Sequence, residues 1–325
     1  MSRVTKNIII LDRGNYTTCT VHLHGGTISS YRVNNKEMLY MGKKTAFNNY
    51  SPIRGGIKFA FPYFGSQING PKHGFARNVL WKLEKGPVVN HDGNIEAVFS
   101  LVESEYTKAI WNFKFKICYR LTLCINELRI AVKVANTSRY FPFRFSILTH
   151  SVFNVLDVTK CEIHGLSGCN YAEWKSNGNK TPQDPDDADR PDKITIRGPI
   201  LDLFYDVPPI IEVRNIANNE LKLKIISCES TSCDVLIYNT WNKEPETDDE
   251  YAVQFYPDEY LYALGIGTGH LCSTIRLEPQ NTWRIAYIIQ VVDEEQEARI
   301  QQLAQLLDNP LQLFKDVCTK TETFS

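Results

Sequence analysis

The segment from Ser51 to Asn78 gathers residue types that binding sites often use. It holds Arg54, His73 and Arg77 among many glycines and prolines, so its backbone must follow tight turns. Arginine presents a planar fork of donors that matches phosphate oxygens, and a nearby imidazole can hydrogen-bond to a ligand or move a proton. The residue types therefore indicate an anion site, although both arginines could equally cap carbonyl groups or pair with acids.

The order of residues in this segment resembles that of a known enzyme family. The matching runs are Arg54-Gly55-Gly56-Ile57, Phe61-Pro62-Tyr63-Phe64-Gly65, and His73-Gly74-Phe75-Ala76-Arg77-Asn78 with Trp81. They look like the glucose-6-phosphate 1-epimerase branch of the aldose 1-epimerase-like family. Further matches are Thr149-His150-Ser151-Val152-Phe153 with Asp157, Asn239-Thr240-Trp241, and Asp258-Glu259-Tyr260. The resemblance covers most of the chain and implies a large antiparallel β-sandwich of the galactose mutarotase type.

The resemblance also implies a reaction and roles for individual residues. Such enzymes open and reclose the ring of an aldohexose 6-phosphate, which interconverts its α and β anomers. His150 should be the general acid, and His73 should hydrogen-bond near the ring oxygen. Asp202 should hold sugar hydroxyls, with Asp206 as a rival for that role. The two arginines of the first segment should bind the phosphate, and we expect no cofactor.

One position departs from the family pattern. The family's general base is a Glu that follows the Glu of the Asp-Glu-Tyr motif by about eight residues, and counting on from Glu259 reaches Gly267. Glycine has no side chain that could remove a proton, and the stretch from Gly265 to His270 supplies no acid. Losing a general base typically removes roughly 10²- to 10⁴-fold of rate.

Two functions are therefore open from the sequence. The first is an isomerase that interconverts anomers with reduced activity. The second is a pseudoenzyme that binds a sugar phosphate for regulation or scaffolding. A third possibility, a sandwich kept purely for protein interactions, gives no reason for the intact run from His73 to Asn78.

Composition argues against several other classes of function. The 36 Lys and Arg residues nearly balance the 37 Asp and Glu residues, for a formal net charge of −1. Such a balance gives no field to attract nucleic acid or an anionic membrane surface. No apolar run approaches the roughly eighteen residues of a transmembrane helix, and the first residues do not resemble a signal peptide. We expect a cytoplasmic protein that binds neither nucleic acid nor membrane, and we favour a monomer.

Cysteine and histidine spacing gives little sign of metal or disulfide chemistry. The nine cysteines form no Cys-x-x-Cys pair, so we expect reduced thiols, which suit the cytosol. His22 and His24 would share one face of a strand, a geometry that zinc can use, but no third ligand is visible. We expect no metal.

The elements that must position these residues are strands. Apolar alternation and β-branched or aromatic residues predict them at Ala97–Val102, Phe113–Leu123, Leu128–Ala135, Phe143–Thr149, Ile194–Arg197, Leu221–Ile226, Val235–Tyr238 and Trp283–Val292. Because the runs are short and no helical pattern separates them, they favour antiparallel sheets packed face to face over a parallel α/β fold.

Two segments interrupt this pattern within what we expect to be one domain spanning residues 1–325. Residues 170–192 are polar and rich in Asp and Pro, which predicts a solvated loop insertion. Residues 293–316 are predicted to form a short C-terminal helical segment. There, Ile300, Leu303 and Leu307 recur at helical spacing before Asn309-Pro310 ends the pattern.

Overall fold

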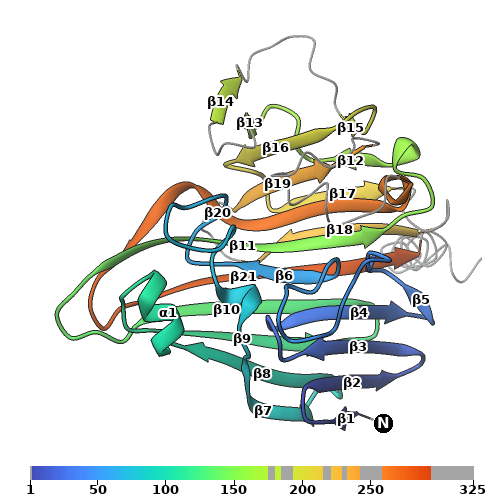
Figure 1. Cartoon of the computed structure of the whole chain (residues 1–325). Coiled ribbons are helices and arrows are strands. Elements are labelled where there is room, and N and C mark those ends of the chain that lie inside the picture. The colour runs from blue at the N-terminus through green and yellow to red at the C-terminus, as the bar shows by residue number, and fades with distance from the viewer. Residues whose placement is uncertain are drawn as a thin grey trace, which may run out of the picture.

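Two large antiparallel sheets make up the computed structural model, which describes residues 2–174, 180–183, 193–214, 221–228, 233–241 and 258–293 (Figure 1). The 12-stranded sheet runs in the order β1 (Arg3–Val4), β2 (Ile8–Gly14), β3 (Thr17–His22), β4 (Thr27–Val33), β6 (Ile57–Ala60), β11 (Phe143–Asn154), β20 (Ala263–Leu277), β19 (Asp234–Asn239), β16 (Ile200–Tyr205), β13 (Asn170–Trp174) and β14 (Lys180–Gln183). The short strand β5 (Lys36–Glu37) pairs with β4.

The second sheet has nine strands. Their order is β15 (Lys193–Thr195), β12 (Glu162–His164), β17 (Ile210–Arg214), β18 (Leu221–Ser227), β21 (Thr282–Asp293), β10 (Glu127–Asn136), β9 (Phe115–Leu123), β8 (Ile95–Val102) and β7 (Lys82–Val89). Helical structure among the described residues is short: η1 (Ala76–Asn78), α1 (Glu105–Ile110), η2 (Val158–Lys160) and η3 (Glu259–Tyr262). None of these helices is long and apolar enough to cross a membrane.

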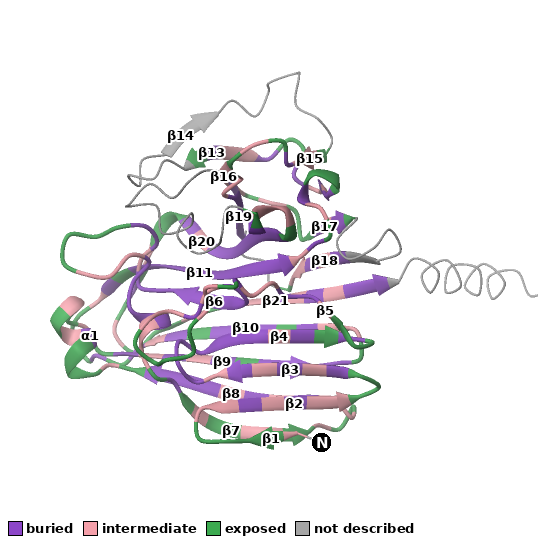
Figure 2. Ribbon diagram, turned by 45° about the vertical axis from the view of Figure 1, so that its right-hand side comes forward, coloured by how far each residue is buried: buried purple, intermediate pink, exposed green. Residues whose placement is uncertain are grey.

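Alternation of side chains explains how the strands pack. On β10, Leu128, Ile130, Val132 and Val134 are buried, and Arg129, Ala131 and Lys133, which alternate with them, are exposed. One face of the strand therefore meets the other sheet and one meets solvent. Strand β11 differs, because it is buried on both faces along most of its length, as the purple segments of Figure 2 show.

The core lies between the sheets and is rich in aromatic rings. Phe59 and Trp81 stack with their centroids 5.1 Å apart, and Phe99 and Tyr119 stack at 4.7 Å. A second apolar cluster lies on or next to the 12-stranded sheet. Along the strands its members alternate with core residues, so the cluster covers the face of that sheet turned away from the core. We call this the outer cluster; its buried members are Ala60, Phe64, Leu148, Val152, Leu203, Leu236, Tyr238, Ala263 and Leu271.

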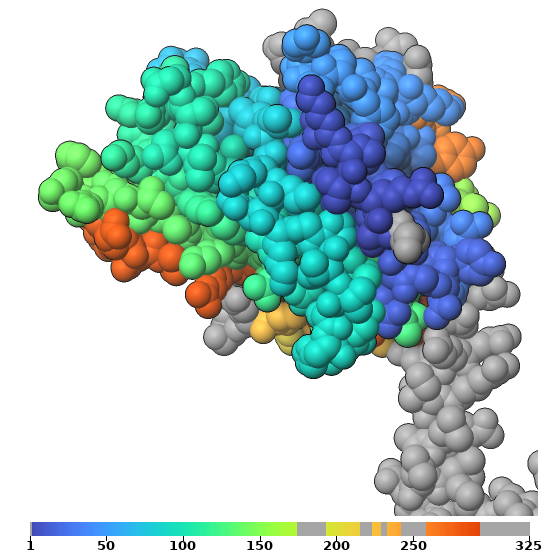
Figure 3. All heavy atoms as spheres, turned by 90° about the horizontal axis from the view of Figure 1, so that it is seen from below, coloured from blue at the N-terminus to red at the C-terminus, as the bar shows by residue number. Residues whose placement is uncertain are grey.

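The first strands close one end of the sandwich. Strands β1 and β2 of the larger sheet contact β7 of the smaller one. Figure 3 shows the corresponding blue and cyan residues side by side on the surface seen from below. At this end of the sandwich, the contacts between edge strands cover apolar side chains that lie between the two sheets and would otherwise be exposed to solvent.

The structure confirms the predicted all-β sandwich, and each of the eight predicted strand runs overlaps an observed strand. Helix α1 was not predicted. It begins where Ser104 and Thr107 form a reciprocal capping box, and its six residues are too few for an apolar period to stand out.

The prediction of a loop over residues 170–192 is wrong for part of its length. Strand β13 pairs with β16 on one side and β14 on the other, and Tyr171 stacks on Phe204 with centroids 5.5 Å apart. Pairing with neighbouring strands stabilises β13 and β14 despite their polar composition. Residue propensity alone does not predict such pairing. Residues 175–179, 184–192 and nearly all of the predicted helical segment 293–316 lie outside the described residues.

Candidate active site

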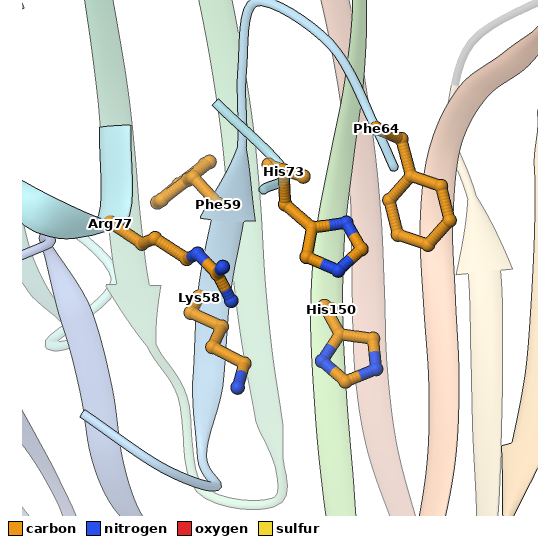
Figure 4. A pocket seen from close by; sticks show the side chains of 7 residues that line it. Lys58, Phe59, Phe64, His73, Arg77 and His150 are labelled. Atoms are coloured by element: carbon orange, nitrogen blue, oxygen red, sulfur yellow. The ribbon is translucent and has the colours of Figure 1, made fainter. Parts of the chain in front are cut away.

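A pocket opens beside strands β6 and β11, where three predicted site residues meet. Its lining residues are Lys58, Phe59, Ala60, Phe64, His73, Arg77 and His150 (Figure 4). About 230 Å³ of space, part of it open solvent, lies between these side chains.

Strand register places four positions in one row across the outer face of the sheet. His150 on β11 is paired with Lys58 on β6 and with Gly267 on β20, and Gly267 is paired in turn with Leu236 on β19. Directly opposite residues share a face of the sheet, with Cβ atoms about 4.5–5.5 Å apart. The row therefore changes from a cation through an imidazole to a glycine and then to an apolar side chain.

His73 is held in the pocket by a demanding turn. Its own φ is +62°, and Gly74 follows at +73°. A Cβ on Gly74 would collide with the carbonyl oxygen of Phe61, so that position accepts glycine alone without rearrangement. The His73 amide donates to the Gly65 carbonyl at 2.7 Å, and its carbonyl accepts from the Phe61 amide at 3.2 Å. A left-handed histidine fixed this firmly is typical of functional sites.

The hydrogen bonds of His73 define its tautomer. The Gly65 amide donates to Nδ1 at 3.1 Å, so Nδ1 carries a lone pair and the neutral ring holds its proton on Nε2. Burial and the nearby charges of Arg77, with a smaller contribution from His150, hold the pKa of His73 well below its usual value. At neutral pH the ring is therefore uncharged and offers Nε2–H as a donor.

His150 is buried on β11 with its ring against that of Tyr238, at a centroid distance of 4.4 Å. Burial is the main cause that holds its pKa well below the usual value, and the charges of Lys58 and Arg77 act in the same direction. The imidazole is consequently neutral near pH 7, which leaves one ring nitrogen able to accept a proton.

Arg77 reaches the pocket from η1, whose backbone the tight turn at Gly74 sets in place. It is buried, and its Nη2 donates to the Lys72 carbonyl at 2.6 Å. That bond aims the guanidinium at the space that Figure 4 shows between Lys58 and the two histidines.

Two other residues that the sequence suggested are placed elsewhere. Arg54 does not line this pocket; its carbonyl accepts from the Thr45 hydroxyl at 2.6 Å. Asp202 lies between Leu201 and Leu203, which pack with the outer cluster, whereas Phe204 packs in the core. Because side chains alternate along a strand, Asp202 is on the core side of β16, the opposite face from His150.

The rival residue Asp206 is exposed in the turn that follows β16, where its φ is +57°. Neither aspartate therefore lines the described pocket. Holding sugar hydroxyls stays a prediction for both of them.

Lys58 is the pocket residue that sequence reasoning missed. It is 3% exposed within the fully buried run Ile57–Ala60 of β6. Lysine is almost never fully buried without a functional or ionic reason. A single lysine inside a short apolar strand, two residues after Gly56 of the Arg54-Gly55-Gly56 run, was the signal that could have identified it.

Neighbouring side chains occupy the space beside Gly267 and Gly265. A Cβ on Gly267 would lie 2.8 Å from Cδ2 of Leu148, and a Cβ on Gly265 would collide with the ring of Tyr238. Among the residues that the structure describes, no carboxylate lines the pocket. Glu259, the nearest acid along the chain, is buried and accepts from the Tyr40 hydroxyl at 2.6 Å.

The alternative of a zinc site receives no support from the described residues. His24 bonds through Nε2 to the Ser51 carbonyl at 3.0 Å, and His22 stacks on Phe47 at 4.6 Å. No group of three or more potential metal ligands occurs in the described part of the chain. The cysteines of that part form no disulfide.

Fold and pocket together define the class of protein. Two large antiparallel sheets packed face to face are also the fold of solved proteins that are named as mutarotases or epimerases. Among solved structures, a protein of Salmonella typhimurium provisionally named a mutarotase superimposes with a TM-score of 0.73 at 20% identity, over 90% of this chain and 93% of that one. A galactose 1-epimerase from Lactobacillus acidophilus superimposes with a TM-score of 0.66 at 10% identity, over 90% and 98%. At these identities the likeness concerns the fold.

The chain belongs to the aldose 1-epimerase family, whose sequence model matches residues 7–290. It is 27% identical over 281 residues to a Cenchrus ciliaris protein provisionally named a glucose-6-phosphate 1-epimerase, covering 84% of this chain and 81% of that one. A Salmonella typhimurium protein with the same provisional name is 32% identical over 151 residues, covering 44% and 47%. Family membership supports an epimerase-type enzyme that interconverts sugar anomers.

Proposed function

We propose that this protein binds an aldohexose 6-phosphate and interconverts its α and β anomers, at a rate limited by the missing carboxylate at position 267. The observation that carries the proposal is the convergence of His73, His150 and Arg77 in one pocket from two separate parts of the chain. Arg77 supplies a charge and a donor fork for the phosphate, and the imidazoles supply groups that can act on the sugar ring.

The missing carboxylate sets the expected rate. Ring opening needs one group to take the C1 hydroxyl proton and another to protonate the ring oxygen. A Glu at position 267 would project from the row that contains His150, whereas Gly267 provides no side chain. A general base is worth roughly 10²- to 10⁴-fold, so turnover is slow compared with a relative that has the carboxylate.

Binding without turnover is the second candidate. It is favoured by Leu148 and Tyr238, which fill the space beside Gly267 and Gly265 where a catalytic side chain would need room. In that case the protein would act as a regulatory or scaffolding binder of sugar phosphate.

Anomeric exchange of glucose 6-phosphate, followed by NMR, separates the two candidates. The wild type should exchange the anomers faster than buffer, and His150→Ala should lose that acceleration. Exchange at the uncatalysed rate in the wild type would refute the enzymatic proposal. A thermal stabilisation by glucose 6-phosphate that disappears in Arg77→Ala would identify the phosphate-binding group independently of turnover.

A reducing compartment suits the proposed protein. The cysteines of the described residues form no disulfide, and Cys228 and Cys272 are exposed. Exposed thiols persist in the cytosol, where glutathione keeps them reduced. We therefore place the proposed activity in the cytoplasm, and fractionation of cells that express a tagged chain would test that placement.

A further inference from the structure

We infer that Lys58 and His150 form the acid–base pair of the pocket: Lys58 protonates the ring oxygen of the sugar while His150 takes the proton of the C1 hydroxyl. The inference rests on the proposed function, since it concerns the same site and the same ring opening. It adds a catalytic residue, Lys58, and reverses the acid role that the family resemblance implies for His150.

Geometry places the two groups together. Lys58 and His150 are direct cross-strand partners on β6 and β11, and each is 3% exposed. Direct partners on one face have Cβ atoms about 4.5–5.5 Å apart. Figure 4 shows both side chains extending into the pocket, with His73 and Arg77 around the same space. A ligand in this pocket therefore meets the amine and the imidazole side by side.

His73 does not fill the role of the base. Its Nδ1 accepts the hydrogen bond of the Gly65 amide, which leaves a protonated Nε2 to face the ligand in the neutral ring. That nitrogen donates a hydrogen bond to a sugar oxygen and has no lone pair with which to take a proton. Of the two imidazoles that line the pocket, His150 is the one that can serve as base.

The charges around His150 keep it ready to accept a proton. Lys58 faces it from β6, Arg77 from η1 and His73 from the preceding turn, while Tyr238 covers it from β19. Burial, Lys58 and Arg77 together hold the pKa of His150 well below its usual value, so the ring is neutral at pH 7. Two neighbouring titratable groups whose environments push their pKa values apart are the usual sign of an acid–base pair.

The acid must be a group that carries a proton at neutral pH and can release it. Among the described lining residues, Lys58 and Arg77 are the cations. A guanidinium keeps its proton throughout the working pH range, whereas a lysine amine serves as a proton donor and acceptor in many active sites. Lys58 is therefore the acid, and Arg77 is the electrostatic partner of the phosphate.

The proposed step balances without any further reactant. His150 takes the proton from the C1 hydroxyl, the C1–O1 bond becomes a carbonyl, and the C1–O5 bond breaks. O5 takes a proton from the Lys58 ammonium, which leaves the open-chain aldehyde, an imidazolium and a neutral amine. Rotation about C1–C2 presents the other carbonyl face, and the reverse proton transfers close the ring as the second anomer.

The test compares exchange of glucose 6-phosphate in the wild type, Lys58→Met and Lys58→Arg. Lys133→Met is the matched control, because Lys133 is an exposed lysine on β10 in the other sheet. Lys58→Met and Lys58→Arg should each lose at least tenfold of the accelerated exchange, with the loss approaching the roughly 10²-fold value of an acid–base group. Lys58→Arg should still be stabilised against heat by glucose 6-phosphate, and Lys133→Met should match the wild type.

A pH profile of the wild type supplies a second readout that does not depend on the folding of a variant. If His150 is the base, acceleration is full near neutral pH and is lost as pH falls through its lowered pKa. If His150 is the acid, acceleration instead grows as pH falls towards that pKa.

Each remaining outcome has a definite meaning. Wild-type exchange at the buffer rate refutes the proposed function, and the pair with it. Accelerated exchange that survives in Lys58→Arg, or that increases in acid, refutes the pair and leaves the proposed function standing.

Discussion

Restoring a carboxylate at position 267 should require a second change at Leu148. A Cβ at position 267 would lie 2.8 Å from Cδ2, 3.0 Å from Cδ1 and 3.1 Å from Cγ of Leu148, a side chain that is fully buried. Gly267→Glu alone therefore overpacks the outer face of the sheet. Such insertions destabilise proteins by about 1–3 kcal/mol, and we expect a loss in that range for the single variant.

Leu148→Ala should offset the loss. On its own, removal of a buried leucine costs about 2–5 kcal/mol, because a cavity remains. In the double variant the introduced glutamate side chain occupies that cavity, so the two changes should be less harmful together than their sum. A double-mutant cycle by urea unfolding should give a favourable coupling energy of about 1–2 kcal/mol, within the range seen for residues in contact.

Anomeric exchange then measures the chemical effect. The double variant should exchange glucose 6-phosphate up to roughly 10²- to 10⁴-fold faster than the wild type, because a carboxylate is restored as base and His150 no longer has to take the C1 hydroxyl proton. Gly267→Ala with Leu148→Ala serves as the control, since it fills the position without a carboxylate. A coupling energy near zero would refute the packing argument. An unchanged exchange rate in a folded double variant would refute the assignment of position 267 as the site of the missing base.

Three further predictions follow from the geometry. Arg77→Ala should weaken binding of glucose 6-phosphate by about 10- to 100-fold in calorimetric titration, the equivalent of one charge-assisted contact, and an unchanged Kd would place the phosphate elsewhere. The lowered pKa values of His73 and His150 mean that the unfolded chain binds more protons below pH about 6.5. The free energy of unfolding should therefore be fully present above that pH and fall as the solution is acidified, by up to about 1.4 kcal/mol per pH unit for each histidine. Urea unfolding at pH 7 and pH 5, of the wild type and of a variant with both histidines changed to Gln, checks this. If the free energy of unfolding of that variant falls between the two pH values as much as that of the wild type, the prediction is contradicted. Tyr40→Phe should cost about 1.5–3 kcal/mol in the same assay, since it removes one of the two donors to Oε1 of the buried Glu259 carboxylate and leaves the Lys43 amide as the other. A loss below about 0.5 kcal/mol would contradict the importance of that bond.

The sequence determined the fold class and part of the site. Period-two alternation and β-branched or aromatic residues identified eight strand runs from the two sheets, because one-sided burial imposes that period whatever the neighbouring strand is. The sequence also indicated a tight turn next to His73, because a position with positive φ, such as Gly74, favours glycine. The proximity of His73, His150 and Arg77 could be expected from a family resemblance, and the structure brings these three into one pocket.

Tertiary structure decided what surrounds those residues. Alternation could not reveal that Asp202 lies on the core face of β16, because the face depends on the register of each strand with its neighbours. Lys58 became visible as a pocket residue through its cross-strand pairing with His150, a contact between positions 92 residues apart in the chain. Likewise, the sequence shows that position 267 lacks the carboxylate. Only the packing between strands shows that the Leu148 side chain occupies the space beside it. Residue types record local backbone demands, whereas the contents of a site depend on which distant side chains the sheet brings into one row.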